Sequence, residues 1–361
     1  MATIMRTRSD RAPARGERPA LSRRTFLACA AGGLWAGLAA AESAATSTAP
    51  AVVEKTSRVA LTQGASRADN ILEILKRIEP QVRAGLAGKK TVVIKPNMVV
   101  TDNQLSATHV ECLEGLLEFL SPMVDGEILV AETPANGPAA EGFANYDYGR
   151  LEKAYRVKLV DLDQQPWETG FIVDERHHPQ PVRLSQVLLD PDAYIVSTAP
   201  FKTHDRAVVT LGLKNVAVGA ILKDVGYRWG AGSQGKTDKH LVHGGQENQG
   251  IHFNLFSLAQ RLAPDLNVLD GFQGSEHNGP IHGTPVDHQV AVASTDWLAA
   301  DRVATDLMGF DHNKVGYLVF AARAGMGETD VERIDILGPP INQLRRSYQP
   351  HDSIEKQYQW M

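Results

Sequence analysis

Residues 92–97 read VVIKPN, a run of buried-type strand residues that ends in Lys95, Pro96 and Asn97. Similar short β-rich runs alternate with helical stretches along the chain, such as 68–79, which repeats apolar residues at the spacing of one helix face. Strands that are separated by helices of this length need right-handed crossovers, which produce parallel strand pairs. The sequence therefore predicts an α/β fold with mostly parallel sheets flanked by helices.

The same patterning predicts the order of elements and two domains. We expect strands at 91–94, 127–131, 158–162, 194–198, 266–270 and 289–294, and helices at 68–79, 107–120, 148–155, 254–262 and 297–308. We assign an N-terminal α/β domain to 58–175, a second α/β domain to 176–338 and a tail to 339–361, with a ligand crevice between the domains. The stretch 219–250 is Gly-rich and polar, which is typical of a functional or mobile loop.

The first 41 residues are typical of a twin-arginine export signal. Arg23 and Arg24 precede the weakly apolar run 27–40, and the alanines at 39–41 form a small-residue cleavage site. The apolar run is shorter than the roughly 20 residues that a membrane span needs, so we expect no stable membrane anchor. An Ala/Ser/Thr/Pro linker over 42–57 follows. We expect the twin-arginine machinery as a partner and a periplasmic or secreted mature protein.

Charge and cysteine content exclude two further classes of protein. The chain has 37 Lys and Arg residues and 42 Asp and Glu residues. The first 41 positions hold seven of the basic residues but only two of the acidic ones. The mature chain that remains after removal of the signal is therefore acidic. A nucleic-acid partner is not expected, because binding nucleic acid needs a basic face. The cysteines are Cys29, in the predicted signal, and Cys112, so an iron–sulfur cluster with several cysteine ligands is not expected either.

Polar residues follow two of the predicted strands. Lys95 and Asn97 follow the strand at 91–94, and ligands bind beyond the carboxyl ends of strands in open α/β sheets. Lys202, His204, Lys214 and Asn215 follow the strand at 194–198 within the runs APFKTHD (199–205) and TLGLKN (210–215). These residues could bind an anionic substrate, with His204 as base or electrophile. Alternatively Pro96 and Asn97 make a turn beside a solvated Lys95, and His204 is a satisfied polar group.

Two segments carry candidate metal ligands. His240 and His243 have a spacing that places two imidazoles on one turn, and the alternative is a solvated polar loop. Residues 270–280, DGFQGSEHNGP, follow the strand at 266–270, and we interpret them as a Gly-rich functional loop. Asp270 and Glu276 there are candidate ligands or an acid–base pair, and Asn278 a candidate substrate-binding residue. The sequence leaves the cofactor open, with a transition metal as one candidate.

These segments together resemble the domain of unknown function 362 family. The resemblance extends over about 58–338 through the runs IKPN, APFKTH, VTLGLKN, DG, NGP and ASTD. Many members of that family add a ferredoxin-like segment with cysteine-ligated clusters, which this cysteine-poor chain lacks. The resemblance therefore implies the fold and a shared site, but no electron-transfer role.

The chain is also distantly similar to the nickel-pincer lactate racemases. In that family a histidine is followed ten residues later by the lysine that holds the cofactor, and His204 and Lys214 reproduce this step. Thr203, Leu213 and Gly230 differ from the pattern at three positions, the last being the expected nickel ligand. The similarity therefore implies a related two-domain α/β fold rather than the pincer cofactor.

Two functions from different classes follow from these observations. The first is an exported enzyme, assisted by a metal or cofactor, that acts on a small anionic substrate by acid–base, isomerase or redox chemistry. The second is a periplasmic protein that binds a ligand or carries a cofactor without turnover. We assign catalysis to His204, Lys214 and Lys202, substrate binding to Lys95, Asn97, Asn215 and Asn278, and metal binding to His240, His243, Asp270 and Glu276.

Overall fold

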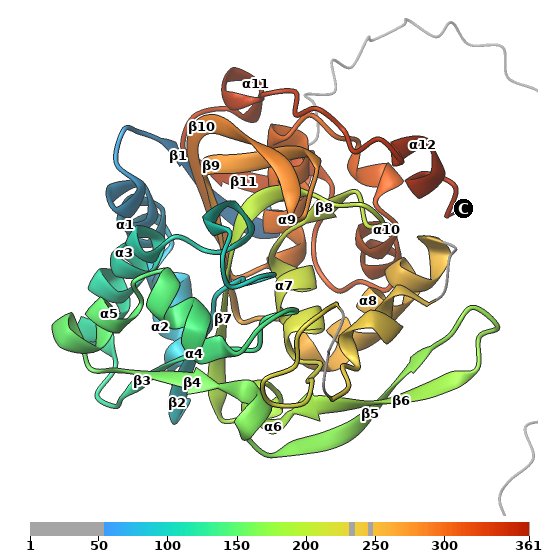
Figure 1. The fold of residues 1–361 in the computed structure, drawn as a ribbon. Helices are drawn as coiled ribbons and strands as arrows, with labels where there is room; N and C mark the ends of the chain where they lie inside the picture. Colours follow the sequence, from blue (N-terminus) through green and yellow to red (C-terminus); the bar gives the residue numbers. More distant parts are fainter. Residues whose placement is uncertain (1–53, 231–234, 245–247, 361) are drawn as a thin grey trace, which may run out of the picture. The chain divides into compact units, whose positions relative to one another are not determined.

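A computed structural model of the chain describes residues 54–230, 235–244 and 248–360. The predicted export signal and most of the linker lie outside these residues. The described part contains a nine-stranded sheet with the order β11-β1-β10-β9-β7-β2-β3-β4, in which β8 pairs with β7 (Figure 1). The strands of this sheet are β1 (Ser57–Gln63), β2 (Thr91–Lys95), β3 (Ile128–Glu132), β4 (Val157–Asp161), β7 (Ala193–Thr203), β8 (Val209–Thr210), β9 (Leu266–Asn278), β10 (His282–Ser294) and β11 (Ile334–Leu337).

The pairing in this sheet is mostly parallel. Parallel pairs join β4, β3, β2, β7 and β9 in turn and also join β1 to β11, whereas β10 runs antiparallel to β9 and β1. A separate hairpin consists of β5 (Trp167–Val173) and β6 (Pro179–Ser185). The predicted α/β class, with a mostly parallel sheet flanked by helices, is confirmed. The nine-stranded sheet takes strands from both of the predicted domain ranges.

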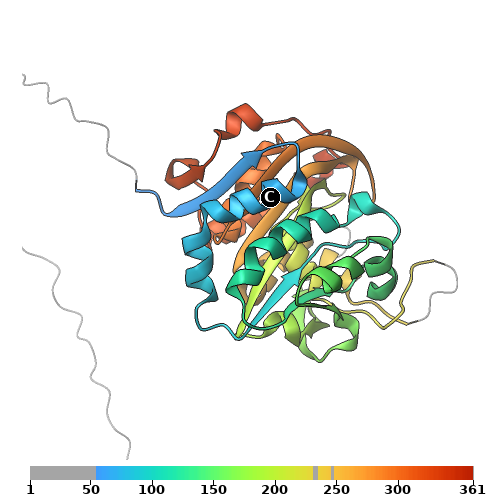
Figure 2. The same cartoon turned by 90° about the vertical axis from the view of Figure 1, so that its left-hand side faces the viewer.

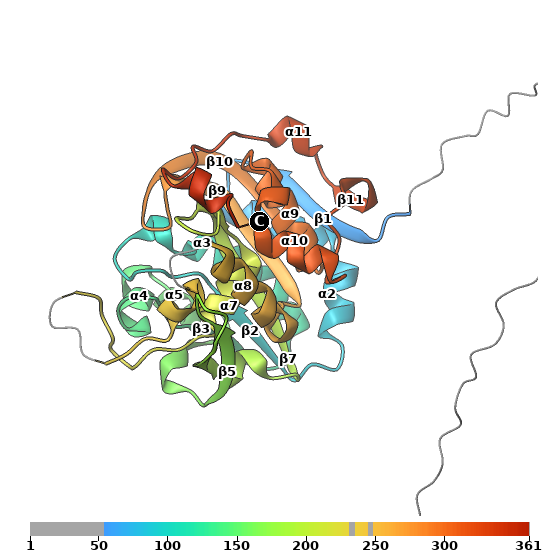
Figure 3. The same cartoon turned by 90° about the vertical axis from the view of Figure 1, so that its right-hand side faces the viewer.

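Helices cover both faces of the sheet. The longer ones are α1 (Arg67–Arg77), α2 (Glu79–Leu86), α3 (Val110–Leu120), α4 (Ala139–Asn145), α5 (Gly149–Ala154), α7 (Gly212–Gly219), α8 (Asn248–Leu262), α9 (Trp297–Leu307) and α10 (Gly316–Arg323). Short helices are α6 (Gln186–Leu189), α11 (Ile341–Leu344) and α12 (Ile354–Gln357), the last two within the predicted tail. The blue-to-green helices α1 to α5 lie on one face (Figure 2), and α7 to α10 on the other (Figure 3).

Both faces of the central strands are buried, which explains their continuous apolar runs. Side chains alternate between the faces, so Val92 and Ile94 of β2 pack with α1 and α3, while Val93 packs on the side of α7 and α9. Helix α9 starts where predicted, because the Asp296 carboxylate accepts hydrogen bonds from the N–H groups of Leu298 and Ala299 (3.0 and 3.1 Å). No helix among the described residues is both long and apolar enough to span a membrane.

One sequence interpretation is wrong. Residues 270–278 are not a Gly-rich loop, because β9 continues through them to Asn278 and pairs with β10 as a long hairpin. The glycines serve packing, since a Cβ on Gly271 would lie 2.6 Å from Val290 and 2.9 Å from Phe201. Only the turn at 279–281 remains outside the two strands.

Candidate functional site

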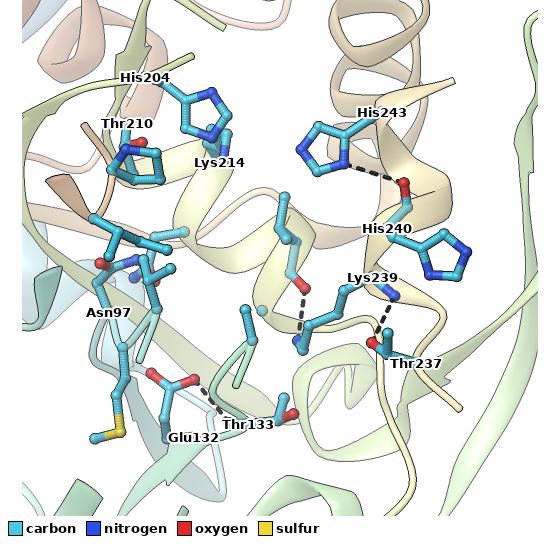
Figure 4. A pocket seen from close by; sticks show the side chains of 18 of the residues that line it. Asn97, Glu132, Thr133, His204, Thr210, Lys214, Thr237, Lys239, His240 and His243 are labelled. Carbon is cyan, nitrogen blue, oxygen red and sulfur yellow. Dashed lines mark hydrogen bonds between the residues drawn. The ribbon is translucent and has the colours of Figure 1, made fainter. Parts of the chain in front are cut away.

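A cavity of about 240 Å³ lies at the carboxyl ends of β2, β3 and β7 (Figure 4). Lys95 is the last residue of β2, Glu132 is the last residue of β3, and His204 directly follows β7. Because these three strands are parallel neighbours, their ends meet at one edge of the sheet. The structure therefore brings most of the predicted site residues to one place, namely Lys95, Asn97, His204, Lys214, Asn215, His240 and His243.

An ion pair between Lys95 and Glu132 forms one part of the cavity wall. The Lys95 ammonium donates to both Glu132 oxygens at 2.7 and 2.8 Å, and each side chain is 1% exposed. The ammonium also donates to the Pro96 carbonyl at 2.6 Å. Burial lowers the pKa of Lys95 and raises that of Glu132, while each charge offsets the effect on its partner. The charge of Lys95 is thus already compensated within the protein.

Two asparagines connect this ion pair to the rest of the site. The Asn215 side chain donates to the Lys95 carbonyl at 2.9 Å, and its oxygen accepts from the Asn97 amide at 3.2 Å. The buried Lys202 ammonium donates to the Asn97 side-chain oxygen and, at 2.9 Å, to the Ser106 carbonyl. Lys202 does not line the cavity, so in this structure it positions Asn97 and does not face a ligand.

Lys214 differs from the other lysines of the site. Its side chain is 8% exposed and lines the cavity, yet within the described residues its ammonium has no hydrogen bond or ion pair. Burial lowers its pKa to about 8, and the Asp205 carboxylate opposes that shift. The Lys214 ammonium therefore has no contacting carboxylate among the described residues, and it can lose its proton near neutral pH.

Asp301 positions the helix that carries Lys214. This buried carboxylate accepts from the N–H groups of Gly212 and Leu213 at 2.9 and 3.1 Å, at the start of α7. The Asn267 amide donates to the same carboxylate at 2.8 Å. Burial raises the pKa of Asp301 to about 6. The start of α7, and with it Lys214, is thus fixed by a side chain of α9.

Three polar groups surround Nδ1 of His204. The N–H groups of Arg206 and Ala207 lie 3.0 and 3.2 Å from it, and an Asp205 carboxylate oxygen lies at 3.0 Å. The two N–H groups favour a proton on Nε2, whereas the carboxylate favours a proton on Nδ1. Burial, followed by the charge of Lys214, lowers the pKa of His204 to about 3, which keeps the ring neutral at pH 7. Nε2 of the neutral ring therefore donates a hydrogen bond in one tautomer and accepts one in the other.

A turn over Lys239–His243 supplies the remaining nitrogen groups. The ring of His243 stacks on that of His204 with centroids 6.2 Å apart, and burial lowers its pKa to about 4. The Lys239 ammonium donates to the Val218 carbonyl at 3.0 Å, and burial lowers its pKa to about 7. Figure 4 shows the side chains of Lys239 and His243 on the wall across from that of Asn97. Sequence reasoning missed Lys239 and Glu132.

The other predicted residues are placed away from the cavity. Asp270 forms a buried ion pair with Arg67 at 3.0 Å, and Glu276 accepts from the Gln349 N–H at 2.8 Å. The Asn278 amide donates to Asp352 at 2.9 Å. None of the three lines the cavity, so Asp270 and Glu276 do not join His240 and His243 in one ligand set. Within the described ranges no group of three or more His, Cys, Asp or Glu side chains is arranged to hold a metal.

Comparisons with known proteins give a family, one similar protein and one solved structure. A thylakoid-associated protein of Synechocystis is 26% identical over 243 residues, which cover 67% of this chain and 70% of that protein. A crystal structure of a Thermotoga maritima protein shares 12% identity with a TM-score of 0.41, and the match covers 68% of this chain and 60% of that one. These matches do not bear on the similarity to lactate racemases, which stays a prediction.

The family match covers the strands and helices that build the site. It extends over residues 92–306, which include β2, β3, β7, α7 and the turn at Lys239–His243. This range is more than half of the chain and holds the four lysines of the site, Lys95, Lys202, Lys214 and Lys239. The chain therefore belongs to the family described as Domain of unknown function (DUF362).

Proposed function

We propose that this chain is an exported enzyme that binds a small anionic substrate in the cavity and moves a proton with Lys214. The observation that carries the proposal is the Lys214 ammonium, which is buried and has no partner among the described residues. A buried charge without a partner is costly, and a bound anion would supply that partner.

The charges around the cavity favour an anion over a cation. Glu132 is neutralised by Lys95, whereas Lys214 and Lys239 have no carboxylate within hydrogen-bonding distance in the described part of the chain. Asp205 contacts His204 at 3.0 Å and is half exposed. The volume of about 240 Å³ lies below the roughly 300–1,000 Å³ of drug-sized ligand sites, so the ligand is small.

In this proposal Lys214 is the base and His204 is the electrophile, one of the two roles that the sequence suggests for His204. Lys214 has a pKa of about 8, so it binds an anion as the ammonium and acts as a base in its neutral form. In the tautomer with the proton on Nε2, His204 donates to an oxygen on which negative charge develops. Lys202 acts through its hydrogen bond to Asn97. The predicted metal ligands do not converge among the described residues, so the proposed proton transfer uses protein side chains.

Deuterium exchange distinguishes an enzyme from a binding protein. We expect one or more members of a panel of small carboxylates to bind and to lose, in deuterium oxide, the proton NMR signal of the carbon next to the carboxylate. Lys214→Arg keeps the positive charge but cannot release its proton, so it should bind the same acid and exchange it about 100-fold more slowly. Lys214→Met should lose about tenfold or more in affinity.

The control for these variants is Lys90→Met, which removes an exposed lysine paired with Asp192. It should bind and exchange like the wild type. Binding without exchange in the wild type would favour the ligand-binding alternative. Unchanged binding and exchange in Lys214→Met would contradict the proposal.

Export is proposed from the arginine pair that precedes the weakly apolar run. Replacing both Arg23 and Arg24 by Lys should leave the precursor in the cytoplasm, because the export machinery reads the arginine pair. The measurement is the fraction of mature protein outside the cytoplasm of its own host. Unchanged accumulation of mature protein there would remove the twin-arginine assignment.

A further inference from the structure

The cavity is lined by apolar as well as cationic side chains, and the proposed function uses only the cationic ones. Val99, Ala135, Trp229 and Ile281 line it from four different segments of the chain. Val99 follows β2, Ala135 follows β3, Trp229 lies in the stretch after α7, and Ile281 is in the β9–β10 turn. None of these four side chains is fully buried.

Trp229 is the largest of these side chains, and 47% of it is exposed. A single exposed aromatic residue needs no explanation on a protein surface. Trp167 on β5 is equally exposed, at 50%, and does not line the cavity. Trp229 differs because its exposed ring shares a cavity with an unpaired cation.

Hydrogen bonds from backbone and side-chain groups connect the segments of this apolar rim. The Trp229 N–H donates to the Asn136 side chain at 2.8 Å, and the Asn136 N–H donates to the Val99 carbonyl at 3.0 Å. The Gly137 N–H donates to the Tyr227 carbonyl at 3.1 Å, and the Asn103 amide donates to the Ile281 carbonyl at 2.9 Å. These bonds order the backbone of the rim before a ligand binds, which lowers the entropic cost of binding.

We propose that the ligand of this site carries a flat apolar group, such as an aromatic ring, in addition to its anionic group. The flat group packs against Trp229, where it removes exposed apolar surface from water and forms an aromatic contact. The anionic group binds at Lys214, and this half of the inference rests on the proposed function. The substrate class is thus a small aryl-substituted anion rather than a simple inorganic or aliphatic one.

Calorimetric titration of the wild-type protein with acetate, phenylacetate and the uncharged phenylacetamide tests the proposal. We expect phenylacetate to bind about tenfold or more tightly than acetate, and phenylacetamide to bind more weakly than phenylacetate. Trp229→Ala should reduce the preference for phenylacetate to about twofold or less, while Trp229→Phe should retain most of it. Trp167→Ala, the matched control, should leave all affinities unchanged.

The outcomes separate this inference from the proposed function. Equal affinities for acetate and phenylacetate, or a preference that survives in Trp229→Ala, would overturn the aromatic subsite alone. A Trp229→Ala variant that weakens both anions equally would overturn it as well. If the wild type binds neither anion, or if Lys214→Met binds both as the wild type does, the anion site itself is contradicted. Thermal unfolding of each variant confirms that it is folded.

Discussion

Glu132→Gln should lower the free energy of unfolding by about 3–5 kcal/mol, the range found when one partner of a buried ion pair is removed. The Lys95 ammonium is 1% exposed. In the variant it would keep three acceptors, namely the Pro96 carbonyl, the Asn215 side-chain oxygen and the amide oxygen at position 132. It would lose the negative charge that offsets its desolvation. The measurement is chemical denaturation at pH 7, where the pair is intact. The expected loss is a large fraction of the stability of an ordinary domain.

Two further variants isolate the cause of that loss. Glu79→Gln makes the same substitution in the exposed Arg83–Glu79 pair and should cost less than about 1 kcal/mol. Adding Lys95→Met to Glu132→Gln removes the unpaired charge and should recover part of the stability. Equal effects of the buried and the exposed substitution would show that the Lys95–Glu132 pair does not carry the charge assigned to it.

In contrast to Glu132→Gln, Lys214→Met should raise the free energy of unfolding at pH 7. The pKa of Lys214 is about 8 in the folded protein and about 10.4 in an unfolded chain. Between these values the unfolded chain binds more protons, so the stability of the wild type rises with pH over this window. Below pH 8 both states are protonated and the full cost remains, roughly 3 kcal/mol. The methionine variant avoids that cost.

The matched control for this gain is Lys90→Met, which should leave the free energy of unfolding nearly unchanged because Lys90 is exposed. A gain in stability together with a loss of anion binding is typical of a residue kept for function. Destabilisation by Lys214→Met would mean that its ammonium has a partner in the folded protein and is not available to a ligand.

The convergence of the site was predictable from the sequence. Lys95, His204 and Lys214 follow strands whose apolar runs are recognisable, and the ends of parallel strands meet at one sheet edge. The same rule applies to Glu132, which ends β3, but a single carboxylate after a strand does not by itself indicate a site. Lys239 lies in a stretch without periodicity, so its position depends on tertiary contacts that the sequence does not display.

The error at residues 270–278 has a different origin. Two glycines and several polar residues there have the composition of a loop, yet the segment is a strand paired with β10. Gly271 is needed for close packing against Phe201 and Val290, which are distant in sequence. The Arg67 partner of Asp270 is equally distant, and so the sequence allowed Asp270 to be interpreted as a metal ligand.

The central claim is that the cavity holds a buried, unpaired Lys214 amine, and its titration tests this most directly. In protein labelled with carbon-13 at the lysine ε position, with Lys214→Arg used for assignment, the Lys214 NMR signal should titrate with a pKa of about 8. Saturating phenylacetate should raise this pKa, because a bound anion favours the ammonium. A Lys214 signal that titrates near the ordinary lysine value of about 10.4, and does not respond to any anion, would contradict the account.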